Sequence, residues 1–150
     1  MARPKPTVRP LAPEDREAWE PLWRGYLRFY RARVPDEVTD TTFARLTNPD
    51  EQPHGLVAVG EGGALLGLAH YQFHRSTWTT GVYCYLEDLF VAPEARGSGA
   101  GRALIERVYA EADAAGAART YWSTQEFNAD ARALYDTLAR RTSFIQYRRS

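Results

Sequence analysis

A glycine-rich turn between an expected strand and an expected helix constrains this chain more than any other feature. Residues Val82–Val91 are rich in β-branched and aromatic side chains and predict a strand, which Pro93 ends because proline lacks a ladder N–H. Glycines follow at positions 97, 99 and 101, and Gly101–Ala115 has the apolar spacing of a helix. The first N–H groups of a helix are unpaired and lie at the positive end of its dipole, so the sequence predicts an anion site here.

Four interpretations of this turn remain open at this point. A Walker P-loop requires a lysine after its last glycine, and this segment contains none. A dinucleotide-binding turn requires Gly-x-Gly-x-x-Gly at the first strand of a βαβ unit, but here the third glycine comes one position early and the turn lies past mid-chain. A pyrophosphate turn for coenzyme A and a plain glycine-rich connection both agree with the glycines. Arg96 and Arg102 would strengthen phosphate binding by charge-assisted hydrogen bonds.

The remaining segments predict an α/β (α+β) fold in a single domain covering residues 1–150. Two helical stretches follow an extended start at Thr7–Arg9, and three strand-like segments then run to Val91. After the glycine turn we expect a helix, a strand at Ala118–Thr124, a helix capped by Asn128 and a last strand at Phe144–Arg148. The order β-α-α-β-β-β-α-β-α-β predicts a mixed, mostly antiparallel sheet with helices on both faces.

Composition excludes several classes of protein. The 19 Lys and Arg balance 19 Asp and Glu, which argues against nucleic acid as a partner. No run of 18 apolar residues and no signal peptide is present, so we expect no membrane association and a cytoplasmic location. Cys84 lies in an apolar strand pattern and is expected to be a buried hydrophobe. Too few ligands surround the three histidines to predict a metal site.

The segment Arg96-Gly-Ser-Gly-Ala-Gly101 resembles the Arg/Gln-x-x-Gly-x-Gly/Ala motif of the GNAT acetyltransferase superfamily. The element order agrees, and Phe127-Asn128…Leu134-Tyr135 is similar to that family's second cofactor-contacting motif. Tyr85–Val91 resembles the spermidine/spermine (diamine) acetyltransferases, and Leu22–Tyr30 resembles the yeast histone/polyamine branch. The resemblance implies a GNAT-like fold and transfer of an acetyl group from acetyl-CoA to a primary amine in a ternary complex, with a polyamine or protein lysine as acceptor.

The resemblance also assigns cofactor contacts residue by residue. The backbone of Leu89–Val91 would pair with the pantetheine arm, Asn128 would bond to it, and Tyr135 would lie near the sulfur. The implied cofactor-binding residues are Leu89, Phe90, Val91, Arg96, Gly97, Ser98, Gly99, Ala100, Gly101, Arg102, Asn128 and Tyr135. One N–H group of Leu89–Val91 would be the oxyanion donor, and the sequence does not indicate which.

Acetyl transfer to an alkylammonium requires a proton acceptor and an acid for the departing thiolate. Glu87 and Asp88 are the candidate acceptors, since two acids in an otherwise apolar strand are costly to bury. Adjacent strand residues face opposite sides unless a bulge intervenes. The resemblance makes Glu87 the base, directly or through water, and gives Asp88 a part in binding the cationic substrate. It makes Tyr135 the acid, whereas its position on a helix face alone favours a core tyrosine.

Aromatic residues on the first helix are the candidate substrate contacts. Tyr26 and Tyr30 follow helical spacing and would hold a cationic amine by cation–π interaction, although core packing explains the same spacing. The chain has room for one strand after its last helix, where many family members have two. We therefore expect a short sheet edge or one completed by a partner chain, which predicts a homodimer. A catalytically weak acyl-CoA-binding regulatory module is the alternative function.

Overall fold

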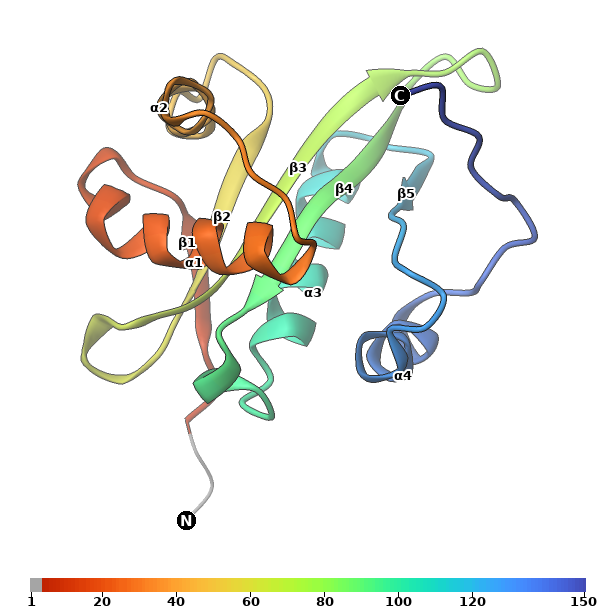
Figure 1. Ribbon diagram of the computed structural model, residues 1–150. Helices are drawn as coiled ribbons and strands as arrows, with labels where there is room; N and C mark the ends of the chain where they lie inside the picture. The colour runs from red at the N-terminus through yellow and green to blue at the C-terminus, as the bar shows by residue number, and fades with distance from the viewer. Residues whose placement is uncertain (1–3) are drawn as a thin grey trace.

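The computed structural model describes residues 4–150 and contains a five-stranded sheet flanked by helices (Figure 1). The strands and helices lie close to where the periodicity of apolar residues predicts them. In chain order they are β1 (Thr7–Pro10), η1 (Pro13–Asp15), α1 (Arg16–Phe29), α2 (Asp36–Leu46), β2 (His54–Val59), η2 (Glu61–Gly63), β3 (Leu65–Arg75), β4 (Val82–Val91), η3 (Pro93–Ala95), α3 (Ala100–Ala114), β5 (Arg119–Tyr121) and α4 (Ala129–Leu138).

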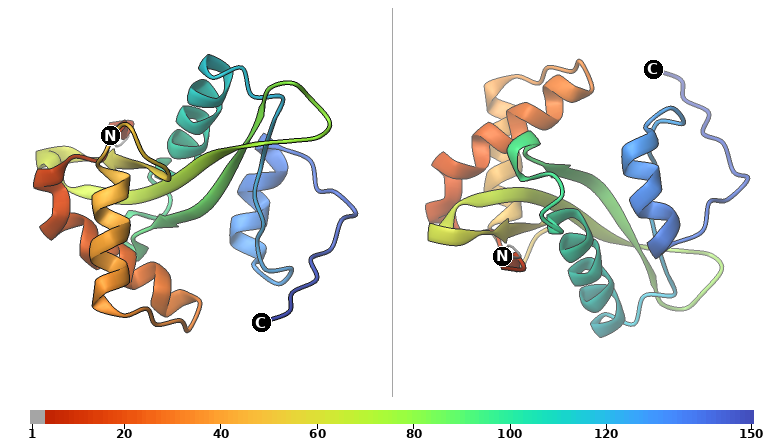
Figure 2. Two further views of the ribbon diagram at one scale, coloured as in Figure 1. Left: turned by 90° about the horizontal axis from the view of Figure 1, so that it is seen from above. Right: turned by 90° about the horizontal axis from the view of Figure 1, so that it is seen from below.

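The sheet has the strand order β1-β2-β3-β4-β5. The first three pairings are antiparallel, and β5 pairs with β4 in parallel after the crossover through α3. Figure 1 shows α1 in front of the sheet and α3 behind it, so the predicted mixed sheet with helices on both faces is confirmed. Figure 2 shows α4 and the C-terminal segment at the end of the molecule away from α1 and α2.

Two apolar cores separate these layers. Trp19, Leu22 and Trp23 of α1 pack with Phe43 of α2 and with Val57 and Leu68 on one face of the sheet. On the other face, Leu104, Ile105 and Val108 of α3 pack against residues that include Cys84, which is buried as predicted. Among residues 4–150, no helix is both long and apolar enough to cross a membrane.

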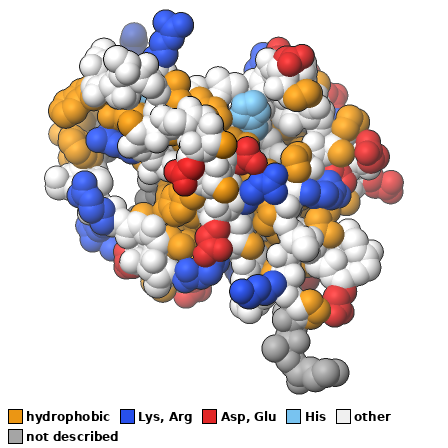
Figure 3. Space-filling view, turned by 180° about the vertical axis from the view of Figure 1, so that it is seen from behind, with side chains coloured by type: hydrophobic (Ala, Val, Ile, Leu, Met, Phe, Trp, Pro, Cys, Tyr) orange, Lys and Arg blue, Asp and Glu red, His pale blue; other side chains and the backbone are white. Residues whose placement is uncertain are grey.

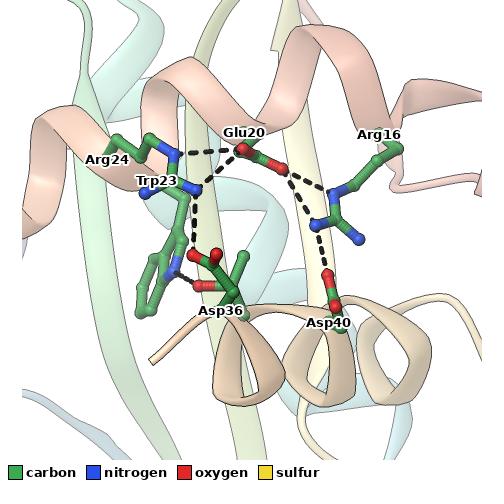
Figure 4. A network of polar contacts seen from close by, with 7 residues as sticks. Arg16, Glu20, Trp23, Arg24, Asp36 and Asp40 are labelled. Carbon is green, nitrogen blue, oxygen red and sulfur yellow. Dashed lines mark hydrogen bonds and ion pairs between the residues drawn. The ribbon is translucent and has the colours of Figure 1, made fainter. Parts of the chain in front are cut away.

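Polar contacts fix α1 against α2 (Figure 4). Glu20 bonds to both Arg16 and Arg24 of its own helix, and these arginines also reach Asp40 and Asp36 of α2. Exposed ion pairs each stabilise by at most about 1 kcal/mol. Their effect here is geometric, because the network sets the position of the helix that carries Tyr26.

The strand predicted at Phe144–Arg148 is wrong. The segment is extended but unpaired, and no other strand of residues 4–150 lies beside it to supply ladder hydrogen bonds. We call residues 139–150 the C-terminal arm. Its Phe144, Ile145 and Tyr147 are 89%, 75% and 89% exposed. Seen from behind, an opening separates the arm from the rest of the molecule, and apolar side chains gather beside it (Figure 3).

Candidate functional site

A β-bulge brings the two carboxylates of β4 to the same face of the sheet. In the pairing of β3 with β4, His70 lies opposite Asp88 and Tyr71 lies opposite Leu86, so Glu87 is an extra residue without a partner. The alternation of side chains therefore shifts by one position at Glu87. Glu87 bonds to Gln72 and Asp88 bonds to His70, and these two β3 residues share one face. That face is the one covered by α1.

Asp88 is held from the interior. Its carboxylate is 2.9 Å from His70 Nδ1, and the His70 ring is 1% exposed. His70 Nε2 in turn lies 3.2 Å from the indole nitrogen of Trp19, which is fully buried. The Asp88 side chain itself is 14% exposed, so one side of the carboxylate remains accessible.

Glu87 is more loosely held. Its residue is exposed, and one bond of 3.2 Å from the Gln72 amide restrains its carboxylate. Loss of hydration on the protein side raises the pKa of Glu87, and the adjacent charge of Asp88 raises it further. A carboxylate with a raised pKa is a stronger base than an ordinary surface glutamate.

Two tyrosines lie near Asp88, and a third lies beyond them. Tyr26 of α1 and Tyr30, which directly follows α1, have ring centroids 5.0 Å apart. Burial raises the pKa of both phenols, and the charge of Asp88 raises each pKa further. Burial also raises the pKa of Tyr135 of α4 to about 12, with a smaller effect from Tyr30. Tyr30 thus lies between the acids of β4 and the phenol of α4.

The glycine turn has the backbone geometry of an anion site. Gly97 and Gly99 have φ values of 84° and 88°, which L-residues adopt at a cost. Gly99 is the N-cap of α3, and a Cβ added at Gly97 or Gly99 would meet no heavy atom within 4 Å. The space beside this backbone is therefore open. Ser98 bonds to the Ala100 N–H through its hydroxyl at 3.3 Å, which leaves the next two N–H groups of α3 free for a ligand.

Two predicted phosphate contacts have a different environment from the one expected. Gly101 is helical rather than positive in φ, and a Cβ there would lie 3.1 Å from Leu134 Cδ2, so this glycine allows α4 to approach α3. Arg102 donates to Thr137 of α4 at 2.8 Å, which directs its guanidinium along α4. Arg96 is exposed beside the turn.

One edge of β4 has no strand beside it over its second half. β5 pairs with β4 only at Tyr83, Cys84 and Tyr85, and β5 ends at Tyr121. Within residues 4–150, Leu86–Val91 therefore face no strand on that side. This free edge includes Leu89, Phe90 and Val91 and leads directly into the glycine turn, so its backbone groups are available to an extended ligand.

The other predicted site residues are placed as follows. Asn128 is the N-cap of α4, as predicted. Its side chain does not make the expected capping bond and instead donates to Thr124 at 3.4 Å. The pKa of the buried Cys84 thiol is raised to about 11, chiefly by burial, which makes it a poor nucleophile. Within the described residues, no three His, Cys, Asp or Glu side chains are grouped so as to hold a metal ion.

Sequence reasoning missed the side chains that support the two acids. His70 was considered only as a metal or substrate ligand, and Trp19 only as core. A signal did exist, because a histidine inside an apolar strand requires a buried polar partner. The bulge itself has no signature in the sequence, since neither Leu86 nor Glu87 is a glycine.

Comparison with known proteins decides among the interpretations of the turn. The model of the Acetyltransferase (GNAT) family matches residues 19–139, which is more than half of the chain. This chain belongs to the GNAT acetyltransferase family. The family resemblance noted in the sequence is thereby confirmed, and among the interpretations of the turn it favours the pyrophosphate turn for coenzyme A.

Relatives of this GNAT enzyme agree with that assignment. The D-amino-acid N-acetyltransferase HPA3 of Saccharomyces cerevisiae is 38% identical over 151 residues, which cover 100% of this chain and 94% of the yeast protein. The thialysine N-epsilon-acetyltransferase of Caenorhabditis elegans is 37% identical over 86 residues, covering 57% of this chain and 52% of the relative. The chain is thus an N-acetyltransferase that uses acetyl-CoA as co-substrate.

Solved structures share its fold at low identity. The enzyme AAC(6')-Iy, solved in complex with the bisubstrate analogue CoA-S-monomethyl-acetylneamine, superposes with a TM-score of 0.83 at 18% identity. The match covers 98% of this GNAT enzyme and 99% of that chain.

Proposed function

We propose that this enzyme transfers the acetyl group of acetyl-CoA to a primary amine by direct attack in a ternary complex. The observation that carries this proposal is the pair of carboxylates Glu87 and Asp88, which the bulge turns to one face beside the free edge of β4. In the reaction a C–N bond forms and the C–S bond of the thioester breaks. The ammonium proton leaves to a base, and the thiolate takes a proton from an acid.

The roles follow from the surroundings of each side chain. Glu87, with its raised pKa and exposed position, accepts the proton of the ammonium group, directly or through a water molecule. Tyr135, with a pKa of about 12, keeps its proton at neutral pH and donates it to the thiolate. An N–H group of Leu89–Val91 stabilises the tetrahedral oxyanion. The turn from Arg96 to Arg102 binds the pyrophosphate, and Asn128 contacts the pantetheine arm.

The charge of the acceptor side favours a cationic substrate. Asp88 anchors the amine, and the rings of Tyr26 and Tyr30 contact it by cation–π interaction. We therefore propose a polyamine or a protein lysine as acceptor. An amino acid is the second candidate, because the yeast relative that spans the whole chain is named as a D-amino-acid N-acetyltransferase.

An amine panel tests these candidates. Thiol release and product mass are measured with acetyl-CoA and spermidine, Nα-acetyl-lysine, D-amino acids and L-amino acids. We expect turnover with spermidine or the lysine derivative. Turnover restricted to amino acids would support the second candidate and contradict the first. If no amine is acetylated above the background hydrolysis of the thioester, the chain is a regulatory acyl-CoA-binding module.

We also propose that the protein is a homodimer in the cytoplasm. The arm exposes Phe144, Ile145 and Tyr147 to solvent, and burying three such side chains stabilises an interface by about 1.5–3 kcal/mol each. The three-residue strand β5 is an edge strand within the described chain, and the arm of a second copy would cover it. Neither nucleic acid nor membrane is proposed as a partner.

A further inference from the structure

A line of buried hydrogen bonds lies behind Asp88, and the proposed chemistry does not use it. The Trp19 indole N–H donates to His70 Nε2 at 3.2 Å, and His70 Nδ1 is 2.9 Å from Asp88 Oδ2. Trp19 is 0% exposed and His70 is 1% exposed. Bulk water therefore does not reach the imidazole, and its two ring nitrogens have only these partners.

The tryptophan fixes the tautomer of the histidine. An indole nitrogen donates one hydrogen bond and accepts none, so His70 Nε2 must accept that bond with a lone pair. The proton of the neutral ring is then on Nδ1, where it is donated to Asp88. The imidazole is therefore held so that its N–H group points at the carboxylate.

The other charged and titratable groups near these buried hydrogen bonds lie on α1 and β4. From α1, the guanidinium of Arg16 lies 6.0 Å from the Trp19 ring centroid, on a helix that faces His70, and opposes a second positive charge there. Tyr26 and Tyr30 of α1 face Asp88. From β4, the remaining group is Glu87, which bonds to Gln72 rather than to His70.

We propose that Trp19 and His70 are positioning residues that hold the Asp88 carboxylate in one orientation as an anchor for the acceptor ammonium. This inference rests on the proposed amine acetyltransfer, and it separates the two carboxylates. Asp88 binds the cation, and Glu87 moves the proton.

Imidazole ¹⁵N NMR of the full-length protein tests the protonation state independently of catalysis. The protein has three histidines, and the spectrum of His70→Asn identifies the signals of His70. We expect the neutral ring of His70 to carry its proton on Nδ1. In Trp19→Phe the indole donor is removed, and the tautomer protonated on Nε2 should become populated. A neutral ring protonated on Nε2 in the wild type overturns the proposal.

Acceptor kinetics test the consequence for binding. In Trp19→Phe the acceptor KM should rise about tenfold relative to wild type, with a smaller change in kcat; tenfold corresponds to about 1.4 kcal/mol. Trp23→Phe is the matched control, since Trp23 packs on Trp19 and donates to Thr39 instead of His70. An equal rise of KM in both variants, or none in Trp19→Phe, contradicts the proposal.

Two substitutions of His70 compare a side chain that keeps the hydrogen bond to Asp88 with one that loses it. Asparagine retains an N–H donor at the Nδ1 position and does not titrate, so His70→Asn should keep an acceptor KM near that of the wild type. His70→Leu should raise the acceptor KM at every pH. An unchanged acceptor KM in a folded His70→Leu protein would contradict the proposal. If no amine is acetylated at all, the proposed function fails, while the NMR result still decides the state of His70.

Discussion

Neighbouring residues on one strand differ in chemistry because their surroundings differ. Asp88 is bonded to a buried imidazole, whereas Glu87 is exposed and has one amide partner. The sequence predicted that both acids matter, from the cost of acids in an apolar strand. It did not predict that they share a face, because the bulge depends on how β3 and β4 pair over their whole length.

Replacing Glu87 tests its role through the pH profile. Since its pKa is raised, kcat/KM should fall as the pH drops through a value above that of an ordinary glutamate, where the base becomes protonated. Glu87→Gln should lower kcat/KM about 100-fold and remove this acid limb. Asp88→Asn removes the neighbouring charge and should shift the limb to lower pH. A limb that is unchanged in Glu87→Gln belongs to another group.

Replacing Tyr135 by phenylalanine tests the acid. We expect kcat to fall about 10²–10⁴-fold with little change in affinity for coenzyme A, because the ring remains and only the proton donor is lost. Tyr109→Phe is a suitable control, since Tyr109 also packs on Trp122 and its hydroxyl donates to Leu138 O, away from the acids. Steady-state kinetics and calorimetry measure both effects. Turnover like that of the wild type in Tyr135→Phe would exclude the tyrosine from the mechanism.

At the scale of elements, the glycine turn and the free edge of β4 are continuous and together form the proposed cofactor-binding surface. The turn was predictable, because proline, glycine and helical spacing each have a local physical cause. The free edge was not, since it depends on β5 ending at Tyr121 while β4 continues to Val91. The role of Gly101 was not predictable either. A Cβ at this position would meet Leu134, which lies on a helix far away in the sequence.

A branched side chain in the turn should weaken cofactor binding. Gly99→Val would fill the open space beside the backbone, and we expect the Kd for coenzyme A to rise about 10–100-fold as hydrogen bonds to phosphate are lost. Gly62→Val is the matched control, because Gly62 has a φ of 68° and equally open space in the turn before β3. Both variants carry similar backbone strain, so calorimetry separates binding from stability. Equal affinity in Gly99→Val and wild type would refute the turn assignment.

The whole molecule combines a predictable sheet with an arm whose position could not be predicted. All five strands pair with their neighbours in the sequence, so local strand and turn signals and alternation were sufficient. The segment Phe144–Arg148 has the composition of a strand, but composition does not supply a pairing partner. That is why the last predicted strand is absent from the described chain.

Substitutions in the arm test the proposed dimer. We expect the full-length protein to be dimeric at micromolar concentration in light scattering coupled to size exclusion. Phe144→Ser combined with Ile145→Ser should give a folded monomer, because the apolar contact is lost while no core residue changes. Val38→Ser, which changes an exposed residue of α2, should leave the dimer intact. A monomeric wild type, or a dimeric double variant, would count against the arm as the interface.

The free edge of β4 also bears on the tendency of the protein to aggregate. Between Leu86 and Val91 the described chain leaves a row of backbone donors and acceptors without a neighbouring strand. An edge that admits pantetheine also admits a strand from another molecule, which is the first step of edge-to-edge aggregation. In the proposed binding mode the cofactor covers this edge, so we expect the protein to aggregate most readily when coenzyme A is absent.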